Sequence, residues 1–129
     1  MIRLVNPDEL SPPRGFSHAV DSAGERTLWV AGQIGDRPDG TLDEGLVDQF
    51  RRALANVATC MDEAGFPPHS LVRIMIYTTD VAGYRSNLGP LGEAYREQFG
   101  RHFPAVALLG VSELFDPAAK VELVCTAVL

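Results

Sequence analysis

The sequence lacks the features of several large protein classes. Its 129 residues include only two cysteines, Cys60 and Cys125, without the paired spacing of a zinc or redox site. No apolar run approaches the roughly 18 residues of a membrane span, and the first residues have neither the basic patch nor the apolar core of a signal peptide. We therefore expect a cytoplasmic protein with no membrane association, in which both cysteines are small buried hydrophobic residues.

Basic clusters and metal-binding patterns are also missing. The formal net charge is -6 and no run of Lys or Arg is longer than Arg51-Arg52, so a phosphate backbone would be repelled. His18, His69 and His102 lie far apart without ligand spacing. We expect no nucleic-acid partner, no metal and no cofactor. Since 129 residues suit one core of common size, residues 1–129 are predicted to form a single domain.

Apolar periodicity predicts two helices. From Asp43, apolar residues recur at helical spacing up to Met61, with Gln49 among the polar residues assigned to the outer face, and Gly65 suits the C-terminal cap. A second helix is expected from about Val81 to Gly100. Gly89-Pro90 should kink this helix or mark its true start.

Strands are predicted on both sides of these helices. Residues 17–22 and 27–31 are expected to form a hairpin through 23–26, and residues 2–5, 71–79, 102–111 and 120–129 give further strands. In residues 71–79, Arg73, Met75 and Tyr77 alternate with apolar neighbours. The order β-β-β-α-β-α-β-β predicts an α/β (α+β) fold, with a single mixed sheet and both helices on one face.

The last two strands are apolar on both faces, which predicts burial on both sides. Because the helices cover only one face, we expect a second copy of the chain to cover the other. A pocket between subunits would accompany such an assembly.

Short motifs spread over the whole chain resemble the RidA/YjgF family, whose members are also labelled L-PSP endoribonucleases. The matching segments are Asn6-Pro7 with Leu10 and Pro13, 15–20 (GFSHAV), 32–35 (GQIG), Asp39-Gly40, Gln49 with 53–57 (ALANV), Ala64-Gly65, 103–105 (FPA) and Val121-Glu122. The resemblance implies a chorismate-mutase-like fold, a homotrimer with a barrel-like centre, and ligand clefts between subunits.

The resemblance also implies a chemistry. Well-known family members hydrolyse reactive enamines and imines such as 2-aminoacrylate. In them an arginine after Phe-Pro-Ala holds the substrate carboxylate, which uses the fork geometry and constant charge of guanidinium. Val106 occupies that position here. A replacement cation could come from Arg14, Arg73, Arg101 or His102.

Glu122 is the predicted catalytic residue, because it matches the family glutamate that positions water and because a carboxylate in an apolar strand is costly to desolvate. Alternatively, Glu122 faces solvent or forms an ion pair with an arginine at a subunit boundary and has no catalytic role. The predicted substrate-binding residues are Phe16, Ser17, Ile34, Gly35 and Val106.

Three functions remain open from the sequence. The first is hydrolysis of an enamine or imine in an intersubunit cleft, with 2-imino-acid deamination weakened by the missing arginine. The second is a non-catalytic trimer that binds a metabolite or a partner. The third, RNA cleavage, rests on the family label alone, and the acidic charge opposes it.

Overall fold

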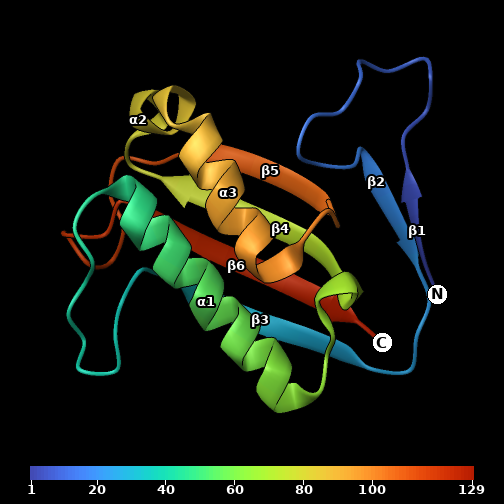
Figure 1. Cartoon of the computed structure of the whole chain (residues 1–129), viewed down its shortest axis with the longest axis horizontal. Coiled ribbons are helices and arrows are strands. Elements are labelled where there is room, and N and C mark those ends of the chain that lie inside the picture. Colours follow the sequence, from blue (N-terminus) through green and yellow to red (C-terminus); the bar gives the residue numbers. More distant parts are fainter.

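The computed structural model describes all 129 residues and contains two sheets and three α-helices. Figure 1 shows α1 and α3 lying across one face of the larger sheet. The strands are β1 (Ile2–Val5), β2 (Ala19–Ser22), β3 (Thr27–Gln33), β4 (Leu71–Thr78), β5 (Ala105–Gly110) and β6 (Val121–Val128). The helices are α1 (Leu46–Ala64), α2 (Val81–Ser86) and α3 (Leu88–Phe99), with a 3-10 turn at Pro68–Ser70. None of these helices is long and apolar enough to cross a membrane.

The larger sheet has the strand order β3-β6-β4-β5, in which β4 and β5 are parallel and the other pairs are antiparallel. The predicted mixed sheet with its long helices on one face is therefore confirmed. Alternation along β6 buries Val121, Leu123 and Cys125 in the core cluster that includes residues of α1 and α3. Intervening residues such as Glu122 and Val124 point to the opposite face.

Helix α1 ends where the sequence predicts but begins later. Gly65 takes φ 77°, and its N–H and that of Phe66 donate to carbonyls of the last turn, as in a glycine-terminated helix. The predicted start at Asp43 is wrong, since α1 begins at Leu46. Asp43 instead accepts from Arg37 at 2.7 Å and lies 3.5 Å from Arg52. The hydrogen bond from Arg37, with the charges of both arginines, lowers the pKa of the Asp43 carboxyl.

The second predicted helix is divided. Asp80 caps α2 by accepting from the Gly83 N–H at 2.8 Å, and α2 ends at Ser86. Helix α3 then starts at Leu88, which puts Pro90 in its first turn, where no amide donor is needed. The expectation that Gly89-Pro90 marks a true helix start is confirmed.

The predicted hairpin between residues 17–22 and 27–31 is wrong. Strand β2 pairs with β1 in a separate two-stranded sheet, whereas β3 pairs with β6, so the single predicted sheet is divided. The connecting backbone bonds to the chain termini instead. Ala23 donates to the Met1 carbonyl, and Glu25 and Arg26 both donate to the Leu129 carbonyl. Because the connecting segment is bonded to both chain termini, β2 and β3 do not pair with each other and belong to different sheets.

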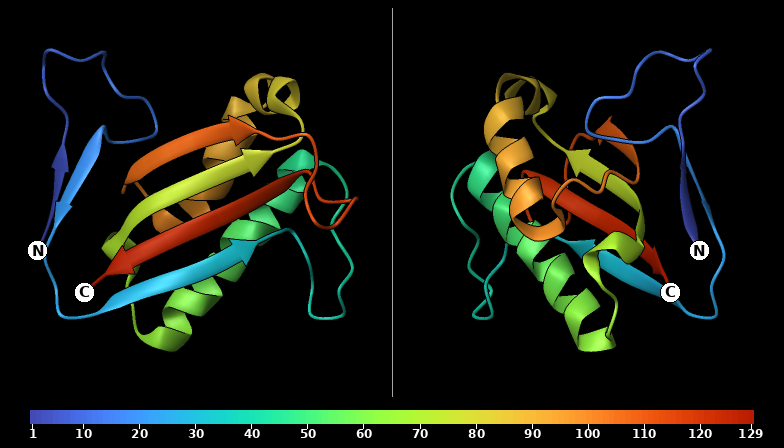
Figure 2. Two further views of the ribbon diagram at one scale, coloured as in Figure 1. Left: turned by 180° about the vertical axis from the view of Figure 1, so that it is seen from behind. Right: turned by 45° about the vertical axis from the view of Figure 1, so that its right-hand side comes forward.

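The sheet face opposite the helices is uncovered in the single chain, as seen from behind in Figure 2. In the single chain β5 is an edge strand with exposed Leu108 and Leu109, so the predicted burial of its second face by another copy stays a prediction. Trp29 is 77% exposed although it lies on β3. We call this surface the open face; the strand residues used below that lie on it are Trp29, Arg73, Met75, Tyr77, Ala105, Ala107, Glu122, Val124 and Thr126.

Candidate functional site

A pocket of about 530 Å³ lies at the end of the sheet where β4 and β5 begin. Figure 2 shows the β1–β2 hairpin beside this end. We call this cavity the hairpin pocket; its lining residues are Phe16, Ser17, His18, Val20, Ser22, Val72, Arg73, Ala105, Val106 and Ala107. Three of the six predicted site residues, Phe16, Ser17 and Val106, therefore lie together.

Ser17 fixes one wall of the hairpin pocket to β5. Its backbone N–H donates to the Pro104 carbonyl at 2.8 Å, and its hydroxyl donates to the Phe103 carbonyl at 2.6 Å. The side chain is buried, and its proton is committed to this carbonyl. Ser17 thus holds the segment carrying Phe16 against the sheet, and its hydroxyl has no activating base beside it.

The aromatic wall is ordered by the preceding loop. Phe16 meets the His18 ring edge-on, with centroids 5.3 Å apart. His18 Nε2 donates to the Ser11 carbonyl at 2.7 Å, and the His18 backbone N–H donates to Asn6 Oδ1 at 2.8 Å. These bonds give His18 a structural role and leave Phe16 facing the cavity.

Val106 is an apolar wall residue of the hairpin pocket. It is half-buried and also packs against the core. Of the four cations considered as replacements, Arg73 alone lines this pocket. His102 is unsuitable because its Nε2 donates to the Leu71 carbonyl at 2.6 Å.

Glu122 lies at the other end of the open face. It is half-buried and pairs in register with Tyr77, near the end of β4. A Cβ added to Gly32 would stand 2.3 Å from Glu122 Oε1, so the carboxylate lies directly over the bare backbone of Gly32. Within the chain the carboxylate makes no ion pair within 4.0 Å and accepts no hydrogen bond.

Ile34 and Gly35 are near this end but do not line the hairpin pocket. The Asn56 side chain donates to the Ile34 carbonyl at 3.1 Å and to the Asp36 carbonyl at 3.0 Å. A Cβ on Gly35 would lie only 2.4 Å from Gln49 Cα. Both residues therefore secure the end of β3 to α1.

Gln49 is a buried polar residue that the sequence pattern assigned wrongly to the outer face of the helix. It is 3% exposed. Its side-chain nitrogen donates to the Ala118 carbonyl at 3.0 Å, and its oxygen accepts from the Lys120 N–H at 2.7 Å. Gln49 thus fixes the start of β6 two residues before Glu122. Gln49 follows Leu46 by three residues and directly precedes Phe50, and both neighbours face the core. This spacing could have identified Gln49 as a buried residue from the sequence.

The predicted residues form two groups rather than one. Arg73, at the hairpin pocket, and Tyr77, beside Glu122, are four residues apart on β4, which corresponds to about 13 Å along a strand. The hairpin pocket and Glu122 therefore lie at opposite ends of the open face of one chain.

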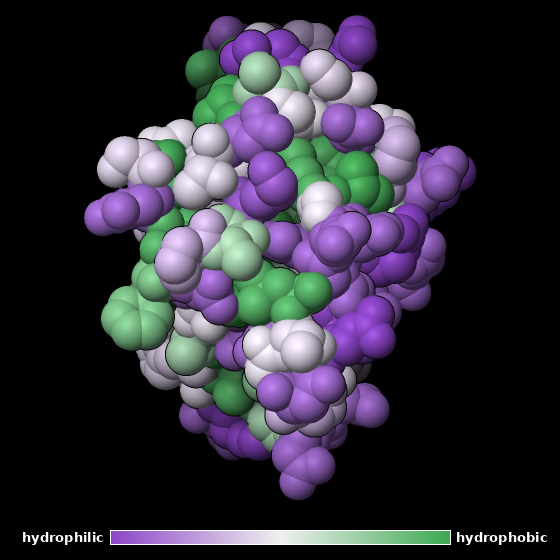
Figure 3. All heavy atoms as spheres, turned by 90° about the vertical axis from the view of Figure 1, so that its left-hand side faces the viewer, coloured by the Kyte–Doolittle hydropathy of each residue, from purple (hydrophilic) through white to green (hydrophobic).

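The Glu122 end carries a second hollow. Figure 3 looks at this end and shows apolar patches between hydrophilic residues. The loop between β5 and β6 contributes a cavity of about 630 Å³ together with Thr79, and its Phe115 is fully exposed.

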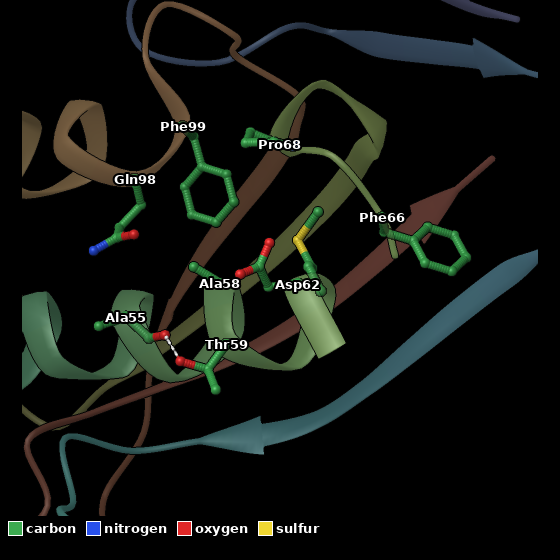
Figure 4. Close-up of a pocket in the computed structure, with 9 residues that line it drawn as sticks. Ala55, Ala58, Thr59, Asp62, Phe66, Pro68, Gln98 and Phe99 are labelled. Carbon is green, nitrogen blue, oxygen red and sulfur yellow. Dashed lines mark hydrogen bonds between the residues drawn. The ribbon is translucent and has the colours of Figure 1, made fainter. Parts of the chain in front are cut away.

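A further pocket lies between α1, α3 and the 3-10 turn (Figure 4). It contains none of the predicted residues. The Thr59 hydroxyl donates to the Ala55 carbonyl at 2.9 Å, and Arg26 lies 4.6 Å above the Phe66 ring. Asp62 is its one charged group, so the pocket offers little chemistry.

Neither metal binding nor thiol chemistry has support among these residues. No three His, Cys, Asp or Glu side chains are close enough to share a metal ion. Burial, together with nearby Cys60, raises the pKa of the Cys125 thiol to about 12, so it stays protonated at neutral pH. Cys125 is a small buried hydrophobic residue, as predicted.

Comparisons with known proteins agree with this fold. The family model described as Endoribonuclease L-PSP matches residues 7–129. A RutC family protein from Aquifex aeolicus is 33% identical over 128 residues, covering 96% of this chain and 98% of the relative. A RutC family protein from Pyrococcus horikoshii is 30% identical and covers 88% of each chain. The crystal structure of YyfB, a Rid family protein of unknown function from Yersinia pestis, is 32% identical with a TM-score of 0.89, covering 99% of this chain and 98% of that one.

Proposed function

Because the chain belongs to the Rid/YjgF family, also described as Endoribonuclease L-PSP, we propose that it hydrolyses a small reactive enamine or imine in clefts of a homotrimer. The observation that carries this proposal is the unpaired, half-buried Glu122 carboxylate, the one acidic side chain on the open face. A carboxylate in this setting is suited to orient water and to accept its proton.

The proposed reaction needs no cofactor. Water adds to the carbon of the protonated C=N bond while Glu122 takes one water proton, which gives a carbinolamine. Glu122 then returns this proton to the nitrogen. The C–N bond breaks as the hydroxyl group becomes the carbonyl, and the hydroxyl proton leaves with the ammonia as ammonium. The atoms of the imine and one water account for both products.

A homotrimer would complete the site. The hairpin pocket and Glu122 lie at opposite ends of the open face, so contact between unlike ends of successive copies brings them together. Such head-to-tail contacts close into a ring when the rotation permits. The exposed apolar residues Trp29 and Val124 would be covered in that ring. The expected number of subunits, three, comes from the family resemblance. The cytoplasmic location likewise stays a prediction from the sequence.

The basic test is the rate of ammonia release from 2-iminobutanoate, generated in place by a dehydratase acting on threonine. Release faster than in a protein-free control supports the hydrolase. A purified trimer that leaves the uncatalysed rate unchanged, even with Val106→Arg, would favour the metabolite-binding trimer, for which the missing family arginine is the specific observation.

Trp29→Glu is expected to dissociate the assembly, because it places a charge on the open face at an exposed apolar position of the edge strand β3. Sedimentation velocity should show wild-type trimer and a mostly monomeric variant at micromolar concentration. Leu88→Glu is the matched control, since Leu88 is 60% exposed on α3, away from this face. A trimeric Trp29→Glu variant would contradict assembly through the open face.

Gly32→Ala should reduce activity with little loss of stability. Its methyl group would displace the end of the flexible Glu122 side chain, whereas Gly35→Ala would meet the backbone of Gln49. We therefore expect Gly32→Ala to lower turnover at least tenfold with a Tm within a few degrees of wild type, and Gly35→Ala to lower the Tm much more. Thermal unfolding and ammonia release measure the two effects. Equal loss of stability in both variants would argue against this position of Glu122.

A further inference from the structure

We infer that the loop between β5 and β6 holds the organic group of the substrate, and that this group is aromatic or apolar and carries no carboxylate. The substrate class is then imines of primary amines rather than 2-imino acids. The inference rests on the proposed function for the reaction, but not for the binding of a stable molecule of the same shape.

The cavity formed by this loop, which we call the loop pocket, lies next to Glu122. Thr79 lines the cavity, and its N–H donates to the Lys120 carbonyl at 3.1 Å, so β4 stays paired with the chain that leads into β6. Thr79 follows Tyr77, the register partner of Glu122, by two residues. Side chains two residues apart on an extended strand share a face and lie about 7 Å apart. An imine whose carbon lies at Glu122 therefore has the loop pocket within reach of its organic group.

Phe115 is the aromatic wall of the loop pocket, and its side chain is fully exposed. The backbone that follows it is fixed. The Asp116 side chain accepts from the Ala118 N–H at 2.9 Å, and Gln49 donates to the Ala118 carbonyl and accepts from the Lys120 N–H. An exposed ring anchored beside a cavity offers its face to an aromatic group or to a cation.

The charges at the loop pocket disfavour a carboxylate. Glu113 is the one charged residue among the seven that line the cavity, and it forms no ion pair. Glu122 adds a second negative charge nearby. Two carboxylates attract a protonated imine and repel a substrate that carries its own carboxylate.

The binding test uses benzamidine, a planar cation that has the aromatic ring and the C=N group of a protonated imine, and benzoate, an anion of the same shape. Amide resonances of Thr79, Leu114 and Ala119 are followed by NMR at constant ionic strength. We expect benzamidine but not benzoate to shift them. Phe115→Ala should weaken benzamidine binding about threefold to tenfold, the range for an aromatic contact, and Phe115→Tyr should retain it. Leu88→Ala removes another exposed apolar side chain, on α3, and should leave binding unchanged.

The activity test compares two imines at equal trimer concentration. One is phenylmethanimine, generated in place by a flavin amine oxidase acting on benzylamine, and the other is 2-iminobutanoate. Hydrolysis of phenylmethanimine consumes one water and gives benzaldehyde and ammonia. We expect its acceleration over the protein-free rate to be at least about tenfold greater than that of 2-iminobutanoate. Phe115→Ala should raise KM for phenylmethanimine and leave the rate with 2-iminobutanoate unchanged.

The inference is overturned by equal binding of benzamidine and benzoate, by unchanged benzamidine affinity in Phe115→Ala, or by a larger acceleration for 2-iminobutanoate. Dissociation of the Phe115→Ala trimer in sedimentation velocity also overturns it, since Phe115 would then be an interface residue. Failure of the proposed function gives a different result. If benzamidine binds as expected while neither imine is hydrolysed faster than without protein, the loop pocket stands and the hydrolase fails.

Discussion

Glu122→Gln is expected to lower imine hydrolysis by about a hundredfold or more, the usual contribution of a general acid or base. The amide keeps the shape of the side chain but cannot accept the water proton. Because Glu122 makes no hydrogen bond or ion pair in the chain, the substitution should leave the fold intact. Ammonia release from 2-iminobutanoate at equal trimer concentration measures the effect.

Glu63→Gln is the control for this substitution, since Glu63 is exposed on α1 and has no ion pair. It should retain wild-type turnover. The binding-trimer alternative predicts that neither variant changes a rate already equal to the uncatalysed one. Full turnover by Glu122→Gln would remove Glu122 from the mechanism.

Gln49→Leu is expected to destabilise the chain by about 2 kcal/mol, because two partly buried backbone groups lose their partners at roughly 1 kcal/mol each. Those groups are the Ala118 carbonyl and the Lys120 N–H. Leucine has nearly the volume of glutamine, so the loss should come from hydrogen bonding rather than from a cavity. Urea unfolding measures the change in the free energy of unfolding.

Gln98→Leu provides the comparison for Gln49→Leu. Gln98 lies on α3, is only half-buried, and its amide makes no hydrogen bond. Its substitution should change stability by less than about 0.5 kcal/mol. If Gln49→Leu were equally mild, the bonds that fix the start of β6 would contribute little to the position of Glu122.

The sequence correctly predicted the helices and strands in which apolar residues recur with one clear periodicity. The alternation of Arg73, Met75 and Tyr77 on β4 and the end of α1 at Gly65 both match the structure. In these segments side-chain burial and glycine geometry act within a few residues. The mixed sheet under two long helices followed from their order.

Features that depend on distant partners were not predictable from the sequence. The β2–β3 hairpin failed because the connecting backbone bonds to Leu129 and Met1. Gln49 was misplaced because its partners are about 70 residues away in the sequence. The placement of Arg73, alone among the four candidate cations, at the hairpin pocket depends on the tertiary fold around that pocket, which local sequence patterns do not contain.

The central claim is that one cleft combines Glu122 of one copy with the hairpin pocket of another. The most direct measurement is the activity of trimers formed by co-refolding equal amounts of Glu122→Gln chains and of Ala107→Trp chains, in which the new side chain fills the hairpin pocket; each variant is expected to have little activity alone. With random assortment in a head-to-tail ring, about a quarter of the clefts receive both intact groups, so about a quarter of wild-type ammonia release should return. Mixed trimers as inactive as their parents would place both groups in the same chain's site and contradict the shared cleft.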